Sequence, residues 1–277
     1  MKKNLKIYQI CYSEETLNQI PDGFLALDNL SNSRPDWREY WPIRNFLLNS
    51  QLDEDSLYGF FSPKFQNKTT LSFNDIQKFI NEKYSDEDTV TFSPYWDLLS
   101  LFKNVFEQGD VFHPGLVLET QNFVNHINYD IDISNHISHS KNTVFCNYFL
   151  AKPSFWKDWL VLGEKLFEYA ENKNHRISEF TTYGKEQVHM KVFVMERIVN
   201  LLLLKDNIKC LNYDIFRLNP SACVLNKLLH ESIISDSLKL AYDQTGYQIY
   251  LNQFADIRDK VNNYLHSFDI DYQKISI

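Results

Sequence analysis

Short apolar runs alternate with amphipathic stretches over the first three quarters of the chain. The runs are rich in β-branched and aromatic residues and are bounded by polar residues or proline, which is typical of strands. Between them, apolar residues recur at helical spacing. The predicted strands are 6–12, 23–27, 56–61, 88–92 and 143–151. The predicted helices are 36–48, 72–81, 95–106, 121–127, 153–171 and 187–204.

Two helix starts carry local signals. Ser72 followed by Asp75 resembles a capping box, in which side chain and backbone satisfy each other's hydrogen bonds. Pro153 stands at the first position of a long helix, where its missing N–H costs nothing. Both helices are therefore expected to begin sharply.

The alternation of strands and helices up to about residue 205 indicates an α/β layered fold. From residue 221 onward the pattern is mainly helical, with few helix breakers. We therefore predict a core at 1–205 and a helical C-terminal appendage at 206–277 that packs on the core.

Glycine content narrows the function. Only 7 of 277 residues are glycine, and no G-x-G-x-x-G or G-x-x-x-x-G-K-[ST] motif is present, so a Rossmann dinucleotide site and a P-loop are both disfavoured. Any phosphate must then be held by side chains, helix N-termini or a metal ion. The net charge of 28 − 36 = −8 argues against nucleic acid as a partner but leaves room for a small basic pocket.

Cysteine spacing and hydropathy indicate the compartment. Cys11, Cys146, Cys210 and Cys223 form no C-x-x-C pair, so neither a zinc site nor a disulfide framework is expected. No stretch of 18 apolar residues exists, and the N-terminal sequence does not resemble a signal peptide. Reduced thiols and a cytoplasmic location are the expectation.

Polar residues at the predicted strand ends are the first candidates for a site. Asp28-Asn29 ends a strand, where ligands bind in open α/β sheets, although an Asx turn explains the pair equally well. Lys64 follows the strand 56–61 and is either a phosphate contact or a surface lysine. Asp130 and Asp132 form a weak D-x-D, which is either a metal site or a solvated loop.

Two further pairs of titratable residues are candidates for a site. One lies in a segment rich in glycine and proline, and the other lies among apolar residues. Glu107 and His113 lie among two of the seven glycines and one proline, a composition typical of a loop with defined geometry. Glu196 and Arg197 lie in an apolar helix, where they form either part of a site or a structural ion pair.

The order of several segments resembles a known family, the DUF4422-type glycosyltransferases of bacterial capsule and lipopolysaccharide loci. Each segment is a weak match alone, and the shared order over residues 6–205 is the evidence. In chain order, the segments are DWREYWPIRNFL, LYGFFSPKF, DTVTFSP, FEQGDVFHPG, TVFCNYFLAKPSFWKDWLVLGEKLFEYAE and MKVFVMERIVNLLLL. The family's motifs fall on Ser62–Phe65, Asp88–Pro94, Glu107–His113, Asn147–Lys152 and Met195–Ile198.

The resemblance implies a GT-A-like, Rossmann-like mixed sheet flanked by helices. It also implies transfer of a sugar from a nucleotide-sugar, with a UDP-sugar as first choice, to a glycan or lipid-linked glycan acceptor at the inner face of a membrane. If the protein is such a transferase, our candidates for donor binding are Asp28, Asn29, Arg44, Ser62, Lys64 and Arg197. Our candidates for catalysis are Glu107, His113 and Glu196. Our candidates for acceptor binding and stacking are Trp37, Tyr40, Asn147 and Trp156.

The chain departs from the family at two places. The histidine and arginines of the family's H-Y-R-R-Y turn are missing, and Lys64 is the cation that remains there. No D-x-D ends a strand where a GT-A fold has one, so we expect no dedicated metal motif. The weaker alternative is Mn²⁺ or Mg²⁺ held by Asp130 and Asp132.

Three other functions remain open on the sequence. The departures favour a glycan-binding or scaffold protein with a degenerate glycosyltransferase fold. A nucleotidyltransferase would need Asp130 and Asp132 to hold metal. An α/β interaction protein would use the helical C-terminus to bind a partner.

Overall fold

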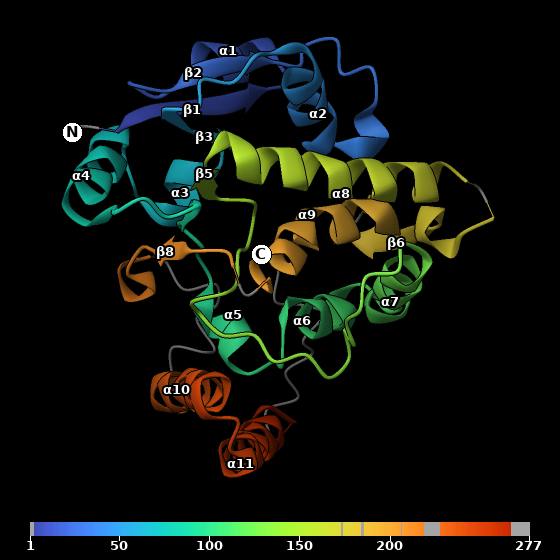
Figure 1. The fold of residues 1–277 in the computed structure, drawn as a ribbon. Coiled ribbons are helices and arrows are strands. Elements are labelled where there is room, and N and C mark those ends of the chain that lie inside the picture. Colours follow the sequence, from blue (N-terminus) through green and yellow to red (C-terminus); the bar gives the residue numbers. More distant parts are fainter. Residues whose placement is uncertain (1–2, 173, 184–185, 206, 219–227, 267–277) are drawn as a thin grey trace. The chain divides into compact units, whose positions relative to one another are not determined.

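The computed structural model describes residues 3–266 except 173, 184–185, 206 and 219–227 (Figure 1). Contacts divide the chain into two compact units. Unit 1 comprises residues 1–94, 144–178 and 191–219, and unit 2 comprises residues 95–143, 179–190 and 220–277.

Unit 1 is built on a six-stranded sheet. The strand order is β2-β1-β3-β5-β4-β8, and β5 runs antiparallel to both of its neighbours while the other pairs are parallel. The strands are β1 (Asn4–Cys11), β2 (Leu25–Asp28), β3 (Ser56–Phe61), β4 (Thr89–Thr91), β5 (Phe149–Ala151) and β8 (Cys210–Asn212). The predicted mixed α/β fold is confirmed.

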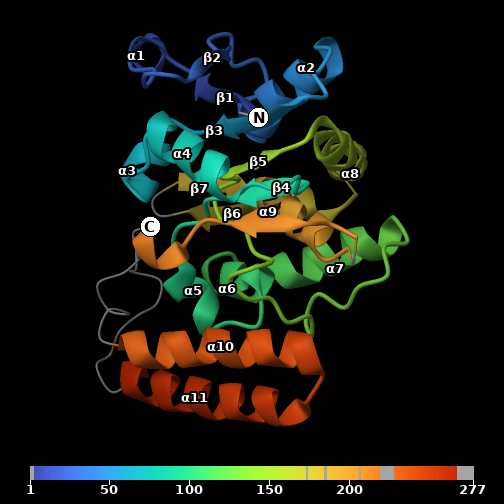
Figure 2. The same cartoon turned by 60° about the vertical axis from the view of Figure 1, so that its left-hand side comes forward.

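Helices cover both faces of this sheet, α3 and α4 on one and α2 and α8 on the other (Figure 2). Side chains of β3 alternate between them: Phe61 stacks on Phe65 of α3, whereas Phe60 meets Trp156 of α8 edge to face. The helices of unit 1 are α1 (Glu14–Asn18), η1 (Pro35–Trp37), α2 (Tyr40–Asn49), α3 (Phe65–Thr69), α4 (Phe73–Lys83), α8 (Pro153–Glu171), η2 (Arg176–Ser178), α9 (Met190–Leu203, from residue 191 on) and η3 (Ile215–Arg217).

Unit 2 is mainly helical and carries a two-stranded ribbon. Its last two helices form an antiparallel hairpin that turns at Gly246, whose φ of 70° suits a residue without a side chain (Figure 2). The elements are α5 (Trp96–Ser100), α6 (Val105–Phe112), α7 (Leu116–His126), β6 (Phe180–Tyr183), β7 (Glu186–His189), α10 (Leu229–Thr245) and α11 (Gln248–His266).

The units do not follow the boundary predicted at residue 205. β8 lies beyond that boundary and pairs with β4 in the sheet of unit 1, while residues 95–143 group with the C-terminal helices. A three-residue strand has too few side chains to show a strand pattern, so the sequence did not reveal β8. None of the described helices is both long and apolar enough to span a bilayer.

Candidate active site at the carboxyl edge of the sheet

The chain order reverses around β1, because β2 pairs on one side of it and β3 on the other. In open α/β sheets, ligands bind beyond the carboxyl ends of the strands at such a point. The antiparallel β5 begins at this same edge, so the residues that precede Phe149 also lie there. This edge brings together residues from several distant segments.

The segments after β3 and before β5 meet directly. Ser62 Oγ lies 2.7 Å from the hydroxyl of Tyr148, which is fully buried. From α3, the Lys68 ammonium donates to Cys146 Sγ over 3.3 Å. Lys64 is exposed, and its ammonium has no partner among the described residues. One edge therefore holds two lysines beside a hydroxyl pair.

The backbone before β5 is held in an unusual conformation. Cys146 and Asn147 have φ of 61° and 55°, in the left-handed region that few side chains adopt. Asn147 is 7% exposed, and its Oδ1 makes no hydrogen bond within the described structure. Such strain persists where the surroundings impose it, and an unpaired buried oxygen costs about 1–3 kcal/mol. Asn147 thus offers an acceptor that a ligand donor would satisfy.

Two carboxylates lie within electrostatic reach of each other at this edge. Glu39 stands at the start of α2, and Glu196 lies on α9. Burial, and then the charge of Glu196, raise the pKa of Glu39 to about 7, although Lys68, Arg38 and Lys64 act in the opposite direction. The Glu39 side chain is only partly screened from solvent and makes no hydrogen bond within the described structure. A carboxyl with this pKa exchanges a proton near neutral pH.

Burial also shifts the pKa values of two neighbouring side chains, Cys146 and Arg197. Burial raises the pKa of Cys146 to about 12, so its thiol stays neutral and is a poor nucleophile. Arg197 is 8% exposed and donates through Nη1 to the carbonyl of Phe193, 2.9 Å away. Burial lowers its pKa, against the charge of Glu196. We call the following residues the edge cluster: Glu39, Ser62, Lys64, Lys68, Cys146, Asn147, Glu196 and Arg197.

Five predicted site residues lie in the edge cluster: Ser62, Lys64, Asn147, Glu196 and Arg197. Sequence reasoning missed Glu39, Lys68 and Cys146. Lys68 follows Lys64 by one helical turn, which was a usable signal. Glu39 and Cys146 gave no signal, because their neighbours are far away in sequence.

Asp28 and Asn29 lie at the carboxyl end of β2, at the same edge. The Asp28 carboxylate accepts from the N–H of Leu30 at 2.8 Å, which closes an Asx turn. Asn29 is 8% exposed, and its N–H donates to the carbonyl of Cys11 at the end of β1. The turn and a nucleoside contact are compatible, since Asp28 is exposed and retains a second oxygen.

Arg44 occupies a structural ion pair. Its guanidinium donates twice to Glu164 of α8, at 2.5 and 2.7 Å, and lies over the rings of Trp41 and Phe167. The hydroxyl of Tyr40 donates to the same carboxylate at 2.5 Å. This arrangement holds α2 against α8 and leaves Arg44 engaged.

The rings predicted to stack on a sugar are buried in unit 1. Trp37 and Trp156 are each 1% exposed and Tyr40 is 2% exposed. The Trp156 Nε1 donates to the carbonyl of Tyr58, and its ring stacks on Phe149. All three rings thus pack within unit 1 and expose almost no surface.

Glu107 and His113 belong to unit 2. The Glu107 carboxylate accepts from the N–H of Lys103 at 2.6 Å and pairs with Arg258 at 3.0 Å. His113 ends α6 and is 5% exposed. The edge cluster, in contrast, belongs to unit 1.

The D-x-D segment also lies in unit 2. The oxygens of Asp132 accept from the N–H groups of Ser134 and Asn135 and from the Asn135 amide, so this carboxylate caps a turn. Asp130 is exposed. Across the described residues, no three His, Cys, Asp or Glu side chains are grouped so that they could hold a metal ion.

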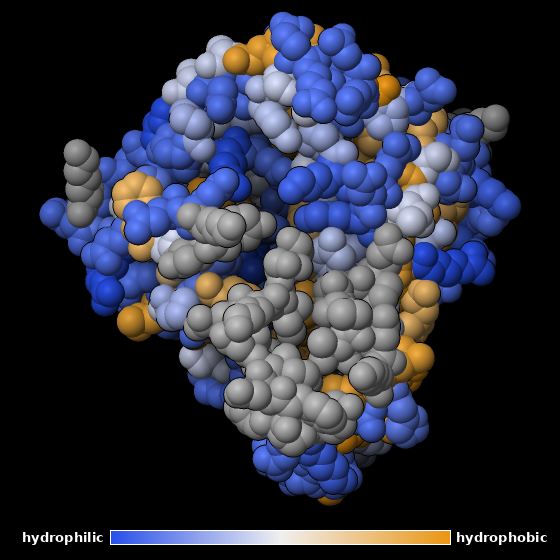
Figure 3. All heavy atoms as spheres, turned by 180° about the vertical axis from the view of Figure 1, so that it is seen from behind, coloured by the Kyte–Doolittle hydropathy of each residue, from blue (hydrophilic) through white to orange (hydrophobic). Residues whose placement is uncertain are grey.

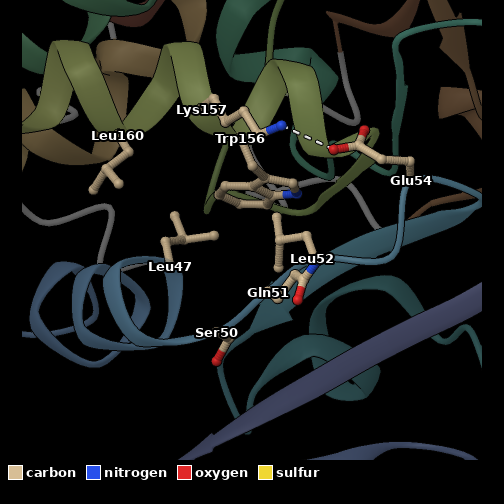
Figure 4. A pocket seen from close by; sticks show the side chains of 8 residues that line it. All are labelled: Leu47, Ser50, Gln51, Leu52, Glu54, Trp156, Lys157 and Leu160. Atoms are coloured by element: carbon tan, nitrogen blue, oxygen red, sulfur yellow. Dashed lines mark hydrogen bonds and ion pairs between the residues drawn. The ribbon is translucent and has the colours of Figure 1, made fainter.

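Unit 1 also contains a cavity of about 310 Å³ away from the edge cluster (Figure 4). It lies beside the segment that leads into the amino end of β3, and the indole of Trp156 faces Leu47, Leu52 and Leu160 across it. The exposed pair of Glu54 and Lys157, 2.8 Å apart, lies at its edge. Ser50, Gln51, Glu54 and Lys157 share the lining with these apolar side chains, and none of the edge-cluster residues takes part.

Hydrophilic residues predominate among the described residues on one face of the protein. On the face opposite to that of Figure 1, apolar residues form scattered patches between polar ones (Figure 3). The net charge of −8 argues against a phosphate backbone as a partner.

Comparisons with known proteins give one distant likeness. No family model matches the chain, and no curated protein sequence matches it. A solved structure of the bifunctional glycosyltransferase WbbM, in its apo form, superposes with a TM-score of 0.47 and 15% identity over 78% of this chain. The match spans 45% of that protein's length. A likeness this weak carries no argument about the present chain.

Proposed function

We propose that this protein is a glycosyltransferase that uses the edge cluster to move a sugar from a nucleotide-sugar to an acceptor hydroxyl. The proposal rests mainly on Glu39, whose pKa is raised in part by the charge of Glu196, and on the lysines beside it. These residues lie at the edge of the sheet where the strand order reverses. Sugar transfer needs a base for the incoming hydroxyl and positive charge for the departing diphosphate. The edge cluster contains both.

Glu39 is the proposed general base. With a pKa raised to about 7, its carboxylate form accepts a proton efficiently near neutral pH. The acceptor oxygen forms a bond to the anomeric carbon, its proton passes to Glu39, and the bond between that carbon and the diphosphate oxygen breaks. Glu196 keeps the basicity of Glu39 high through its negative charge.

Lys64, Lys68 and Arg38 are the proposed partners of the diphosphate. All three charges lower the pKa of Glu39, so they lie within electrostatic reach of the base. They would offset the charge that develops on the leaving group, in the role that a divalent ion plays in metal-dependent transferases. Asp28 and Asn29 would bind the nucleoside further along the same edge, and Arg197 stays a donor-side candidate.

The acceptor side is proposed from the resemblance to the DUF4422-type family. It implies a hydroxyl of a bacterial surface glycan or polysaccharide, free or lipid-linked, and a place at the inner face of the membrane. A UDP-sugar is the proposed donor.

Donor binding is the first test. We expect UDP or GDP to raise the melting temperature by several degrees, since ligand at 100 times its Kd adds about 2.7 kcal/mol of stability. CMP, a nucleoside monophosphate, is measured beside them for comparison. Lys64→Ala should weaken this binding, whereas Lys78→Ala, an exposed lysine of α4, should leave it unchanged. The same series with Mn²⁺ tests metal dependence.

The base is tested separately by the pH dependence of transfer. We expect kcat/KM to rise with pH through about 7 and to fall by a factor of 10² to 10⁴ in Glu39→Gln, with donor binding retained. If donors bind but no sugar is transferred at any pH, the degenerate glycan-binding protein becomes the better explanation. If no nucleotide binds the folded protein, the proposal is lost.

A further inference from the structure

The buried face of α10 is polar, which is unusual for a helix packed within a folded unit. Its buried residues are Ser232, Ser235, Asp236 and Lys239, whereas Leu229 is 49% exposed. The spacing places these polar residues on one side of the helix. Hydrogen bonds and ion pairs therefore make a large share of the contacts that hold α10.

Part of the opposing surface is the loop at residues 136–143, within the same unit, and the rest includes α5. Asp236 accepts from the N–H of Ser140 at 2.9 Å and from its hydroxyl at 2.6 Å. His139 Nε2 lies 3.3 Å from the Asp243 carboxylate, at the end of the same helix face. Two carboxylates of α10 thus contact two adjacent loop residues.

The geometry around His139 requires a neutral imidazole. Its Nδ1 accepts a hydrogen bond from the N–H of Lys141 at 3.2 Å, so Nδ1 carries no proton. The backbone N–H of His139 donates to Asn142 Oδ1 at 2.8 Å, which fixes the turn. Protonation of Nδ1 would turn it into a donor that faces the N–H of Lys141. The hydrogen bond between them would then be lost, and with it the turn that positions Ser140.

The contact between α10 and the 136–143 loop also leaves several buried polar atoms without hydrogen bonds. Five of the seven buried side-chain polar atoms without a hydrogen bond in the described structure belong to this loop or to the buried face of α10. They are His136 Nε2, His139 Nε2, Thr143 Oγ1, Ser232 Oγ and Ser235 Oγ. Water satisfies such atoms when the helix leaves, so separation recovers hydrogen bonds that docking forgoes.

We propose that protonation of His139, assisted by His136, releases the α10–α11 hairpin from the 136–143 loop, so that the hairpin is an acid-sensitive latch within unit 2. The charged groups facing His139 are Asp243, Asp236 and Lys239 of α10, and the facing titratable group on its own loop is His136.

The direction of the effect follows from burial. Burial lowers the pKa of both histidines below 6.5, and it outweighs the opposing charge of Asp243, which is 57% exposed. The docked state therefore binds fewer protons than the released state below pH 6.5. Docking is favoured above that pH and is lost as the pH falls.

Lys239 contributes to the same interface but does not act as the switch. Its ammonium donates to the carbonyls of Leu99 and Phe102, both at 2.8 Å, and lies over the ring of Phe254. Its surroundings include Glu107 of α6 and Arg258 of α11. These contacts help to hold α10 in the docked state, and they are broken with the others when the hairpin separates.

Amide hydrogen exchange of the full chain, corrected for the intrinsic pH dependence, tests the latch. We expect the protection of α10 to fall between pH 7.5 and 5.0, by up to about tenfold per pH unit for each proton taken up, while that of α7 changes less. His139→Asn keeps an acceptor for Lys141 without titrating, and should flatten this dependence. His230→Asn, at an exposed position of α10, should behave as the wild type.

Two results would overturn the latch. One is a pH dependence of α10 that matches that of α7, and the other is an equally steep dependence in His139→Asn. Should that variant fold poorly, a direct NMR titration decides the matter: an imidazole pKa at or above 6.5 for His139 contradicts the proposal. None of these outcomes depends on sugar transfer.

Discussion

At the residue scale, the raised pKa of Glu39 affects stability as well as catalysis. Its folded pKa of about 7 exceeds the usual 4.5, so the folded state holds a proton that the unfolded state releases between these values. The stabilising contribution is complete below pH 4.5 and disappears as the pH rises through 7. Charged Glu39 is thus a cost at alkaline pH.

Glu39→Gln should therefore stabilise unit 1 at pH 8 by about 1–3 kcal/mol and have little effect near pH 4. Denaturant unfolding at the two pH values measures the difference. Glu82→Gln, at an exposed position of α4, is the control and should show no such trend. Equal effects of Glu39→Gln at both pH values would mean that the carboxyl titrates normally.

Asn147 allows binding to be separated from folding. Its φ of 55° suits glycine, and its Oδ1 is unpaired, so Asn147→Gly removes a strained side chain that makes no hydrogen bond through that oxygen. We expect stability to stay within about 1 kcal/mol of the wild type, while donor affinity falls about three- to tenfold through loss of one hydrogen bond. Calorimetry of donor binding, beside a denaturant titration, measures both. A loss of stability with unchanged affinity would assign Asn147 to the fold alone.

At the element scale, the start of α4 shows how a local signal predicts structure. Ser72 Oγ accepts from the N–H of Asp75 at 3.2 Å, and the Asp75 carboxylate accepts from the N–H of Ser72 at 2.9 Å. This is the capping box that the sequence suggested. We expect Ser72→Ala to cost about 1 kcal/mol in denaturant unfolding, with Asn74→Ala, exposed on the same helix, close to neutral. A neutral Ser72→Ala would show that packing alone fixes this helix end.

Elements with strong local patterns were predicted to the residue. α8 and β3 have the expected bounds, since one has proline at its start and a long apolar stripe, and the other is a compact apolar run. The strand expected at 143–151 is formed only at Phe149–Ala151, because Cys146 and Asn147 adopt left-handed conformations. Such conformations are imposed by tertiary contacts and leave no pattern in the sequence.

Two other elements departed from the prediction for the same kind of reason. The helix expected at 36–48 breaks at Arg38, whose φ is 45°, into η1 and α2. Glu39 owes its place at the start of α2 to that break. The β6–β7 ribbon falls where a polar segment precedes α9, and its four-residue strands are too short to alternate visibly.

At the scale of the whole molecule, the division into two units determines what a stability measurement reports. Four of the five tryptophans, at positions 37, 41, 156 and 159, lie in unit 1, and Trp96 lies in unit 2. Tryptophan fluorescence therefore follows mainly unit 1, so it does not by itself report on the unfolding of unit 2. Amide exchange in α10 and α11 reports on unit 2 directly.

Unit 2 should gain stability as the pH rises above 7, because Lys239 is fully buried. Burial lowers its pKa from 10.5 to about 7, so between these values the unfolded state holds a proton that the folded state has lost. Stability then rises with pH by up to about 1.4 kcal/mol per unit across this window and levels off above 10.5.

Lys239→Met should abolish that slope in the exchange of α10 and α11, whatever its effect on absolute stability. The absolute change is a separate quantity, because methionine removes a charge from the interior but leaves the carbonyls of Leu99 and Phe102 without their donor. Lys157→Met, which removes an exposed ion pair in unit 1, should leave the slope unchanged. If the slope survives in Lys239→Met, Lys239 remains charged in the folded protein, and its two carbonyl contacts outweigh its burial.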